Sequence, residues 1–293
     1  MSERSRILVS MNRLSTERRV AVVQALVEGV SINATCRMTG VAKNTVLKLL
    51  ADLGTACAAY HDENVRDLSC LRIQADEVWS FCYAKAKNVP AEHEGEWGYG
   101  DVWTWTALCA DSKFMVSWTV GDRSADTATY FMEDVESRLA NRVQLTTDGH
   151  RAYLRAVESA FGAGIDYAVL HKLYGKASDG PETRYSPARC IGVSEHRVMG
   201  RPDAKHINTS YVERQNLTMR MSMRRFTRLT NGFSKKIENL EHAIALYFMY
   251  YNFCRPHMSL KGLTPAQRLG IADGRWSIEK LVGLLDPQTV GSN

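Results

Sequence analysis

Two segments of this chain end in the same way, and they constrain the fold more than any other feature. Residues 71–76 (LRIQAD) and 143–148 (VQLTTD) alternate apolar and polar side chains, which is the pattern of a half-buried β-strand. Each closes with an aspartate, Asp76 or Asp148, on the side away from the apolar row. If the strands are parallel neighbours, both carboxylates meet at one sheet edge, where open α/β sheets commonly bind ligands.

The surrounding segments predict a mixed α/β core. Aromatic and β-branched runs at 102–110 and 114–120 are typical of a β-hairpin, with its turn at 111–113. Further apolar periodicity predicts helices at 124–139, 151–161 and 237–253 and a short strand at 167–170. Residues 174–206 are rich in Gly, Pro, Ser and Arg, and we interpret them as a basic loop or insertion. The predicted order of the core is β-β-β-α-β-α-β-α.

The first 54 residues predict a small all-α domain. Ser15 and Ser31 are candidate N-caps, and Gly29 and Gly40 end the first two helices. A short second helix, a turn with Gly40 and a third helix match the spacing of a DNA-binding helix-turn-helix. The residues expected to face the major groove are Lys43, Asn44, Thr45 and Lys48. A three-helix bundle without a nucleic-acid role is the alternative. Residues 55–68 are a helical or loose linker.

The charges are distributed unevenly along the chain, although the net charge is only +5. Residues 55–166 carry 18 acidic and 10 basic side chains, whereas residues 1–54 carry 4 and 8, and residues 167–240 carry 6 and 14. An acidic centre between two basic blocks favours contact with a polyanion at both flanks. Chance clustering on a solvated surface is the alternative.

The apolar runs and the cysteines also indicate in which cellular compartment the protein is expected. No apolar run approaches the roughly 18 residues of a membrane span, and the opening segment is too short in apolar residues for a secretory signal. Seven scattered cysteines without a C-x-x-C pair argue against a disulfide framework and a zinc ribbon. We therefore expect a cytoplasmic, nucleoid-associated protein without a membrane partner, most of whose cysteines are buried.

A basic stretch, Thr209–Leu229, is predicted to be a helix and contains a single acidic residue, Glu213. Glu213 is either part of a capping box that starts at Ser210 or a third carboxylate beside Asp76 and Asp148. Three carboxylates suit Mg²⁺, and two such ions about 4 Å apart can assist phosphodiester displacement. The arginines expected to contact DNA phosphates are Arg214, Arg220, Arg224, Arg225 and Arg228.

Three further residues lie close to these acids in the sequence. Asn216 is a candidate auxiliary residue that supports either the metal site or DNA. His150 either acts at the phosphate and metals or is a loop histidine satisfied by the backbone. Glu77 follows Asp76 directly but points to the opposite face of the strand, so we do not expect it to be a ligand.

Three motifs resemble those of the bacterial insertion-sequence DDE transposases, and most closely the insertion-sequence-one family. They are DEVWSF at 76–81, TDGHRAY at 147–153 and YVERQNLTMRMSMRRFTRLTNGFSK at 211–235. The segment YNFCRPHMSLKGLTPAQ at 251–267 is similar to the closing motif of many integrase-like DDE proteins. The resemblance covers most of residues 14–270.

This resemblance implies an RNase H-like five-stranded sheet of order 3-2-1-4-5 with flanking helices. It implies that Asp76, Asp148 and Glu213 are the catalytic residues and the ligands of Mg²⁺ or Mn²⁺, with two ions. The implied partners are terminal inverted repeats, target DNA and further copies of the chain, in a dimer or larger assembly. The chain departs from the founding insertion-sequence-one proteins because it lacks their cysteine cluster before the helix-turn-helix.

The resulting expectation is a DNA transposase with four parts. These are a helix-turn-helix domain (1–54), a linker (55–68), an RNase H-like core (69–255) with its insertion near 174–206, and a tail (256–293). Its reaction would be hydrolytic nicking at transposon ends, then attack of the freed 3′-OH on target DNA. The alternatives are a DNA-binding regulator without catalysis and an RNase H-like nuclease without strand transfer.

Overall fold

The two aspartate-bearing segments are parallel neighbours in the computed structural model, which describes residues 14–175, 190–227 and 231–286. The strands are β1 (Arg72–Cys82), β2 (Gly100–Cys109), β3 (Met115–Gly121), β4 (Gln144–Thr147), β5 (Asp166–Tyr174) and β6 (Cys190–Met199). They form one sheet of order β3-β2-β1-β4-β5-β6. The β1/β4 and β4/β5 pairs are parallel and the other pairs antiparallel, so the predicted mixed α/β class is confirmed.

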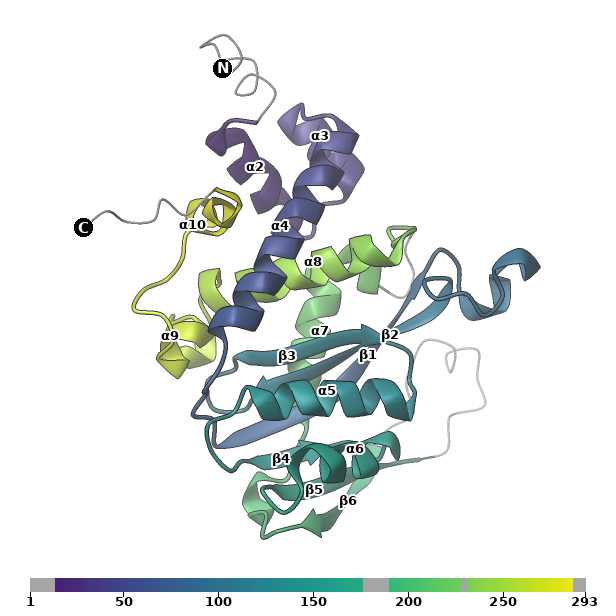
Figure 1. The fold of residues 1–293 in the computed structure, drawn as a ribbon, viewed down its shortest axis with the longest axis vertical. Coiled ribbons are helices and arrows are strands. Elements are labelled where there is room, and N and C mark those ends of the chain that lie inside the picture. Colours follow the sequence, from purple (N-terminus) through teal and green to yellow (C-terminus); the bar gives the residue numbers. More distant parts are fainter. Residues whose placement is uncertain (1–13, 176–189, 228–230, 287–293) are drawn as a thin grey trace, which may run out of the picture.

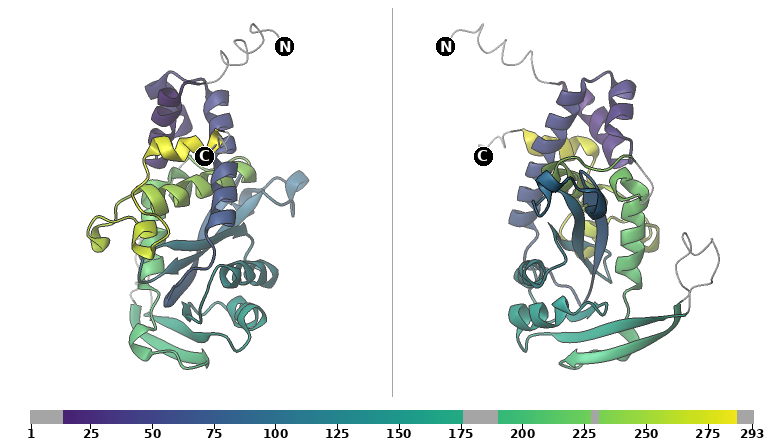
Figure 2. Two further views of the ribbon diagram at one scale, coloured as in Figure 1. Left: turned by 60° about the vertical axis from the view of Figure 1, so that its left-hand side comes forward. Right: turned by 90° about the vertical axis from the view of Figure 1, so that its right-hand side faces the viewer.

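Helices cover both faces of this sheet (Figure 1). The helices α5 (Ala125–Ser137) and α6 (Ala152–Phe161) lie on one face, and α7 (Ser210–Ser222) lies on the other, as Figure 2 shows. A further helix, α8 (Ile237–Met249), contacts β3 where the rings of Trp118 and Phe248 are 5.1 Å apart. Asp76 therefore lies within, and Asp148 directly after, a strand of a sheet between two helical layers, and Glu213 lies in α7.

The N-terminal helices are α2 (Thr16–Val27), α3 (Ile32–Thr39) and α4 (Lys43–Asn64). Ser15 and Ser31 cap α2 and α3 as predicted, since their hydroxyls accept from backbone amides three residues on. Gly40 ends α3 in the left-handed conformation, with φ of 66°. The boundary predicted at residue 54 falls inside α4, which runs on as one helix through most of the predicted linker.

Gly54 allows α4 to cross α8 closely. A Cβ at this position would lie 2.6 Å from the Cα and 2.7 Å from the carbonyl oxygen of His242. Since the contacting atoms include backbone, a side chain at position 54 would force the two helices apart. The N-terminal helices thus pack directly on the sheet-bearing part of the chain.

Gly54→Ala is therefore expected to lower the free energy of unfolding by at least about 1 kcal/mol, even though alanine favours helix formation. Urea denaturation followed by circular dichroism measures the change. Gly274→Ala is the matched control, because a Cβ there meets nothing within 4 Å. A Gly54→Ala protein as stable as the Gly274→Ala protein would contradict this role of the helix crossing.

Two sequence predictions about the sheet edge need correction. The predicted five-stranded sheet has a sixth strand, β6, and this strand lies within 174–206, which was predicted to be a loop. The described part of that segment carries little hydrophobic periodicity because β6 is largely exposed on both faces. Its stabilisation comes from backbone pairing with β5, which extends to Tyr174 instead of ending at Leu170.

Two predictions about the C-terminal half also change. The helix predicted at 209–229 ends at Ser222, because the chain then turns inward to bury Met223 and Phe226. The helix predicted at 237–253 gives way after Met249 to a π-helical turn, Tyr250–Cys254. The predicted tail contains α9 (Pro265–Leu269) and α10 (Ile278–Val282), and α10 packs back against α2.

The structure also bears on the cysteines and on membrane insertion. Over the described residues every cysteine is a free thiol, and the buried ones are Cys57, Cys70, Cys82, Cys109 and Cys254. Burial of most cysteines was predicted and is confirmed. Within the same residues, no helix combines the length and the hydropathy needed to cross a bilayer.

Candidate active site

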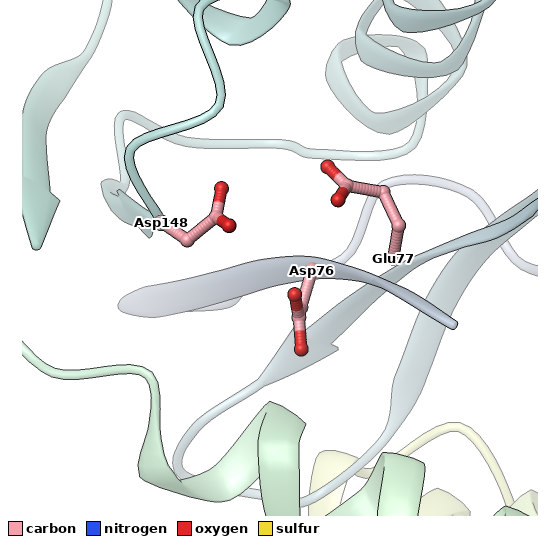
Figure 3. Close-up of side chains that lie close together, drawn as sticks. All are labelled: Asp76, Glu77 and Asp148. Carbon is pink, nitrogen blue, oxygen red and sulfur yellow. The ribbon is translucent and has the colours of Figure 1, made fainter. Parts of the chain in front are cut away.

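Asp76 and Asp148 lie together where the pairing of β1 with β4 ends. The last paired residues are Ala75 and Thr147, so each aspartate is the next residue on its strand. Asp76 was predicted to end its strand, but β1 continues to Cys82 by pairing with β2 alone. The carboxylates of Asp76, Glu77 and Asp148 each place an oxygen within 4.8 Å of the other two (Figure 3). The structure therefore joins the two predicted aspartates and adds a third acid.

Crowding of negative charge changes the protonation of this site. The pKa of Asp76 is raised to about 7, first by burial and then by the charges of Asp148 and Glu213. The pKa of Glu77 is also raised to about 7, by burial and then by Asp148 and Asp76. Removing a proton from such a cluster costs free energy that a bound cation would offset.

Asn216, the predicted auxiliary residue, holds Asp76 in place. Its side-chain amide donates to Asp76 Oδ2 at 2.8 Å. Thr106 of β2 contacts both residues. Its hydroxyl donates to the Asp76 carbonyl at 3.1 Å and lies 3.3 Å from Asn216 Oδ1. Asn216 thus links α7 to β1.

Gln74 determines where α7 begins on the sheet. It lies two residues before Asp76 and so shares its face of β1. Its Oε1 accepts from the backbone amides of Tyr211 and Val212 at 2.9 and 3.0 Å. The first turn of α7 is therefore capped by a side chain of the neighbouring strand, not by its own N-cap residue, Thr209, which makes no side-chain cap bond.

The capping role predicted for Ser210 is wrong. Ser210 is the first helical residue, and its hydroxyl donates to Asn208 at 2.9 Å. Glu213 does not form the capping box either: its Oε1 accepts from the Thr209 hydroxyl at 2.5 Å. The Tyr211 and Val212 amides donate to Gln74 and the Glu213 amide donates to the Thr209 carbonyl, so these amides are bonded without Ser210.

Gln74→Leu should lower the free energy of unfolding by about 1–2 kcal/mol, since it leaves the buried amides at the start of α7 without an acceptor. It should also slow any metal-dependent DNA cleavage, because α7 carries Asn216 and Glu213. Gln74→Glu is the comparison variant: it keeps the accepting oxygens but replaces the amide that donates to Asn208 Oδ1 at 2.6 Å with a charged oxygen. Thermal unfolding of both variants measures the effect, and equal stability of the two would contradict the capping role.

Glu213 lies near the aspartates but is occupied by a cation of the chain itself. Its Oε2 pairs with the ammonium of Lys172, which projects from β5 beyond the end of β4. The Glu213 and Lys172 side chains are 36% and 30% exposed, so water and solutes can reach the pair. The Glu213 charge still contributes to the raised pKa of Asp76. Its carboxylate is not one of the three that lie within 4.8 Å of each other.

Glu77 is the residue that the sequence interpretation set aside. Figure 3 shows that it leaves β1 on the side opposite Asp76, as the alternation predicts, yet its carboxylate turns toward Asp148. Its Oε2 accepts from the Arg123 guanidinium at 3.2 Å. The available signal was its position in the apolar row with Ile73 and Ala75, where a carboxylate needs a specific partner.

His150 combines features of both of its predicted roles. Its backbone amide donates to Asp148 Oδ1 at 2.9 Å and so orients that carboxylate. Its ring packs against those of Trp105, at 5.7 Å, and Tyr153, at 6.0 Å. Burial and the charge of Arg123 lower the pKa of His150, which favours the neutral ring.

The residues predicted to contact DNA differ in their availability. Lys43, Asn44 and Thr45 are exposed at the start of α4, while Lys48 is exposed but pairs with Asp52 at 2.7 Å. In the second block Arg214 and Arg224 are exposed, Arg220 is half-buried and Arg228 lies outside the described residues.

Arg225 is turned into the protein. Its guanidinium donates to Ser234 Oγ at 2.7 Å and to the Asn239 carbonyl at 2.6 Å, and burial lowers its pKa to about 10. These contacts connect the segment after α7 to α8. The structure thus gives Arg225 a packing role that sequence did not indicate.

The two basic blocks share one hollow of about 750 Å³ between the N-terminal helices and the segment after α7. Its lining combines apolar side chains of α2, α4 and α8 with basic residues from both blocks. The basic lining residues are Lys43, Arg224, Arg225, Lys235 and Lys236. Residues almost 200 positions apart in the sequence therefore contribute cations to a single concave surface.

Comparison with known proteins gives one family similarity. Residues 198–265 match the integrase core domain family, and this stretch includes Glu213 and part of the closing motif. No curated protein matches the chain significantly. Among solved structures, the piggyBac transposase synaptic complex with hairpin DNA aligns with 95% of this chain and 74% of its own, at 10% identity and a TM-score of 0.39.

Proposed function

We propose that this chain is a DNA transposase that cleaves DNA at transposon ends and transfers the freed 3′-OH into target DNA. The observation that carries the proposal is the pair Asp76 and Asp148, held side by side at the open edge of two parallel strands. The raised pKa of Asp76, caused first by burial and then by the charge of Asp148, is consistent with a site that gains from a bound cation. The integrase core similarity of residues 198–265 supports the same conclusion.

The chemistry of the donors fits a hard divalent cation. All the groups that face one another are carboxylates, which are the ligands preferred by Mg²⁺ and Mn²⁺. We propose Asp76, Asp148 and Glu213 as catalytic residues and ligands of two such ions. A bound divalent cation supplies Lewis-acid activation of the attacking oxygen and neutralises charge on the leaving oxygen.

The residues of the chain have separate tasks in this reaction. Water attacks phosphorus at the transposon end, the P–O3′ bond breaks, and the 3′ oxygen leaves with a proton as a 3′-OH. That hydroxyl then attacks a target phosphorus and displaces a second 3′ oxygen. Asn216 and the backbone amide of His150 orient the aspartate carboxylates, while Lys172 neutralises Glu213 until a cation competes for it.

DNA binding is assigned to the two basic blocks. We propose that Lys43, Asn44, Thr45 and Lys48 read the terminal inverted repeat, with α3 and α4 acting as a helix-turn-helix. Arg214, Arg220 and Arg224 would contact phosphates, and the same role is proposed for Arg228, which lies outside the described residues. The hollow that both Lys43 and Arg224 line supports contact of one DNA segment with both basic blocks. Synapsis of two ends requires at least a dimer.

A plasmid carrying the genomic DNA from both sides of this gene tests the proposal. With purified protein and Mg²⁺ or Mn²⁺, we expect nicks at the boundaries of short inverted repeats and joining of the cut ends to a second plasmid. Binding without nicking under saturating Mn²⁺ would favour a DNA-binding regulator. Nicking without joining would favour an RNase H-like nuclease.

A further inference from the structure

Glu77 stands apart from the acids considered so far because it approaches Asp148 from the other face of the sheet. Asp76 projects toward α7, whereas Glu77 projects from the opposite side of β1, and its carboxylate and that of Asp148 face one another (Figure 3). All three carboxylates nevertheless come within 4.8 Å. Glu213 is outside this group and is bound by Lys172.

The environment of Glu77 provides a second, independent observation. Its side chain is only 2% exposed, and its Oε1 has no hydrogen-bond partner in the described part of the chain. Leaving a buried carboxylate oxygen without a partner is costly, so native structures rarely do it without a functional reason. The unpartnered oxygen belongs to the carboxylate that faces Asp148.

Other polar atoms around Glu77 are also unsatisfied. The fully buried Tyr153 hydroxyl lies within hydrogen-bonding reach of the Glu77 carboxylate and lowers its pKa, but the contact is poorly aligned. Nε2 of His150, whose ring is next to Tyr153, has no hydrogen-bond partner among the described residues. Buried polar groups thus surround the Glu77 carboxylate on this side of Asp148.

The alternative is a purely structural role, in which Glu77 is a buried acid neutralised by Arg123. This role explains the contact of Oε2 but not the environment of Oε1. The contact is a single hydrogen bond of 3.2 Å to Oε2, and the Arg123 side chain is 41% exposed and also lies over the Trp103 ring. A half-exposed guanidinium compensates a buried charge weakly, and it leaves Oε1 unexplained.

We propose that Glu77 ligates a divalent cation together with Asp76 and Asp148, as a fourth carboxylate of the centre beside Glu213. The inference deepens the proposed function, since the cation would be the one that serves DNA cleavage. Before DNA binds, Lys172 engages Glu213 and the group Asp76, Glu77 and Asp148 provides the cation site. Water molecules would complete the coordination shell, as is usual for Mg²⁺.

Mn²⁺ binding to the DNA-free, full-length chain tests this assignment without reference to activity. Electron paramagnetic resonance titration reports free Mn²⁺ and so gives the affinity. Glu77→Gln should weaken binding at least about 10-fold, because it removes a charged ligand while keeping the side-chain shape. Glu213→Gln should weaken binding less than Glu77→Gln does. Glu158→Gln, an exposed acid on α6, is the control and should leave the affinity unchanged.

Arg123→Gln separates ligation from a structural ion pair. If Glu77 is only the partner of Arg123, removing either residue breaks the same pair, and both variants should lose Mn²⁺ affinity alike through local unfolding. If Glu77 is a ligand, Arg123→Gln removes a competing cation and should tighten Mn²⁺ binding severalfold. Circular dichroism and thermal unfolding establish that each variant is folded. Should Glu77→Gln not fold, the Arg123→Gln titration alone decides the question.

The outcomes distinguish this inference from the proposed function. Loss of Mn²⁺ binding in Asp76→Asn and Asp148→Asn together with normal affinity in Glu77→Gln would overturn the role of Glu77 and leave the aspartate site intact. Unchanged Mn²⁺ binding in the two aspartate variants would instead overturn the metal centre on which the proposed function depends. Weaker binding in Arg123→Gln would also overturn the ligand role.

Discussion

Asparagine in place of Asp148 is expected to slow Mn²⁺-dependent nicking of the end-bearing plasmid by at least about 100-fold. The substitution keeps the side-chain shape and an oxygen that can accept from the His150 amide, but it removes the negative charge that holds a cation against Asp76. Asp76→Asn should have an effect of the same size, since the two carboxylates act on the same ion.

Binding of end DNA separates a catalytic defect from a folding defect. In a gel-shift assay with the flanking DNA, Asp148→Asn should bind within about 2-fold of the unaltered protein, because the residues assigned to DNA lie in other segments. Asp126→Asn, an exposed aspartate in the first turn of α5, is the matched control and should nick at the normal rate. Full activity in Asp148→Asn would remove it from the catalytic set.

The second large effect concerns stability and pH. The metal-free protein should lose stability as the pH rises from about 4 to 8. A carboxyl whose pKa is higher in the folded than in the unfolded chain binds more protons when folded. Its contribution to the free energy of unfolding is therefore present at low pH and is lost as the pH rises through its pKa in the folded chain. Asp76, with a pKa raised from 3.8 to about 7, should contribute on the order of a few kcal/mol.

Comparison with Asp76→Asn isolates this contribution. Other groups also titrate, and His61, whose pKa burial lowers to about 3, acts in the opposite direction below pH 6.5, but it is present in both proteins. The difference in unfolding free energy between them, measured by urea denaturation in chelator from pH 4 to 8, should therefore follow Asp76 and the part of the raised Glu77 pKa that the Asp76 charge causes. Mn²⁺ at about 100 times its Kd should restore about 2.7 kcal/mol at pH 8. A pH-independent difference would contradict the crowding of charge at Asp76.

The metal-ligand candidates could be predicted only where local pattern carries the information. Asp76 and Asp148 were found because alternation and sequence position place each beside the end of a strand pairing. Glu77 was set aside by the same rule. The rule gives the face from which a side chain leaves but not where its carboxylate ends, and that depends on Asp148 arriving from another strand. The ion pair between Lys172 and Glu213 could likewise not be predicted from the sequence, since it joins β5 to α7.

The fold shows the same division. The sequence by itself determined the apolar rows, the helix caps at Ser15 and Ser31 and the mixed α/β class, because these depend on neighbours within a few residues. The tertiary structure alone decided the pairing of the exposed strand β6, the end of α7 at Ser222 and the capping of α7 by Gln74. Backbone pairing uses groups that every residue carries, so it leaves no mark in the sequence. Capping by Gln74 joins residues that are far apart in the chain, so no local pattern predicts it.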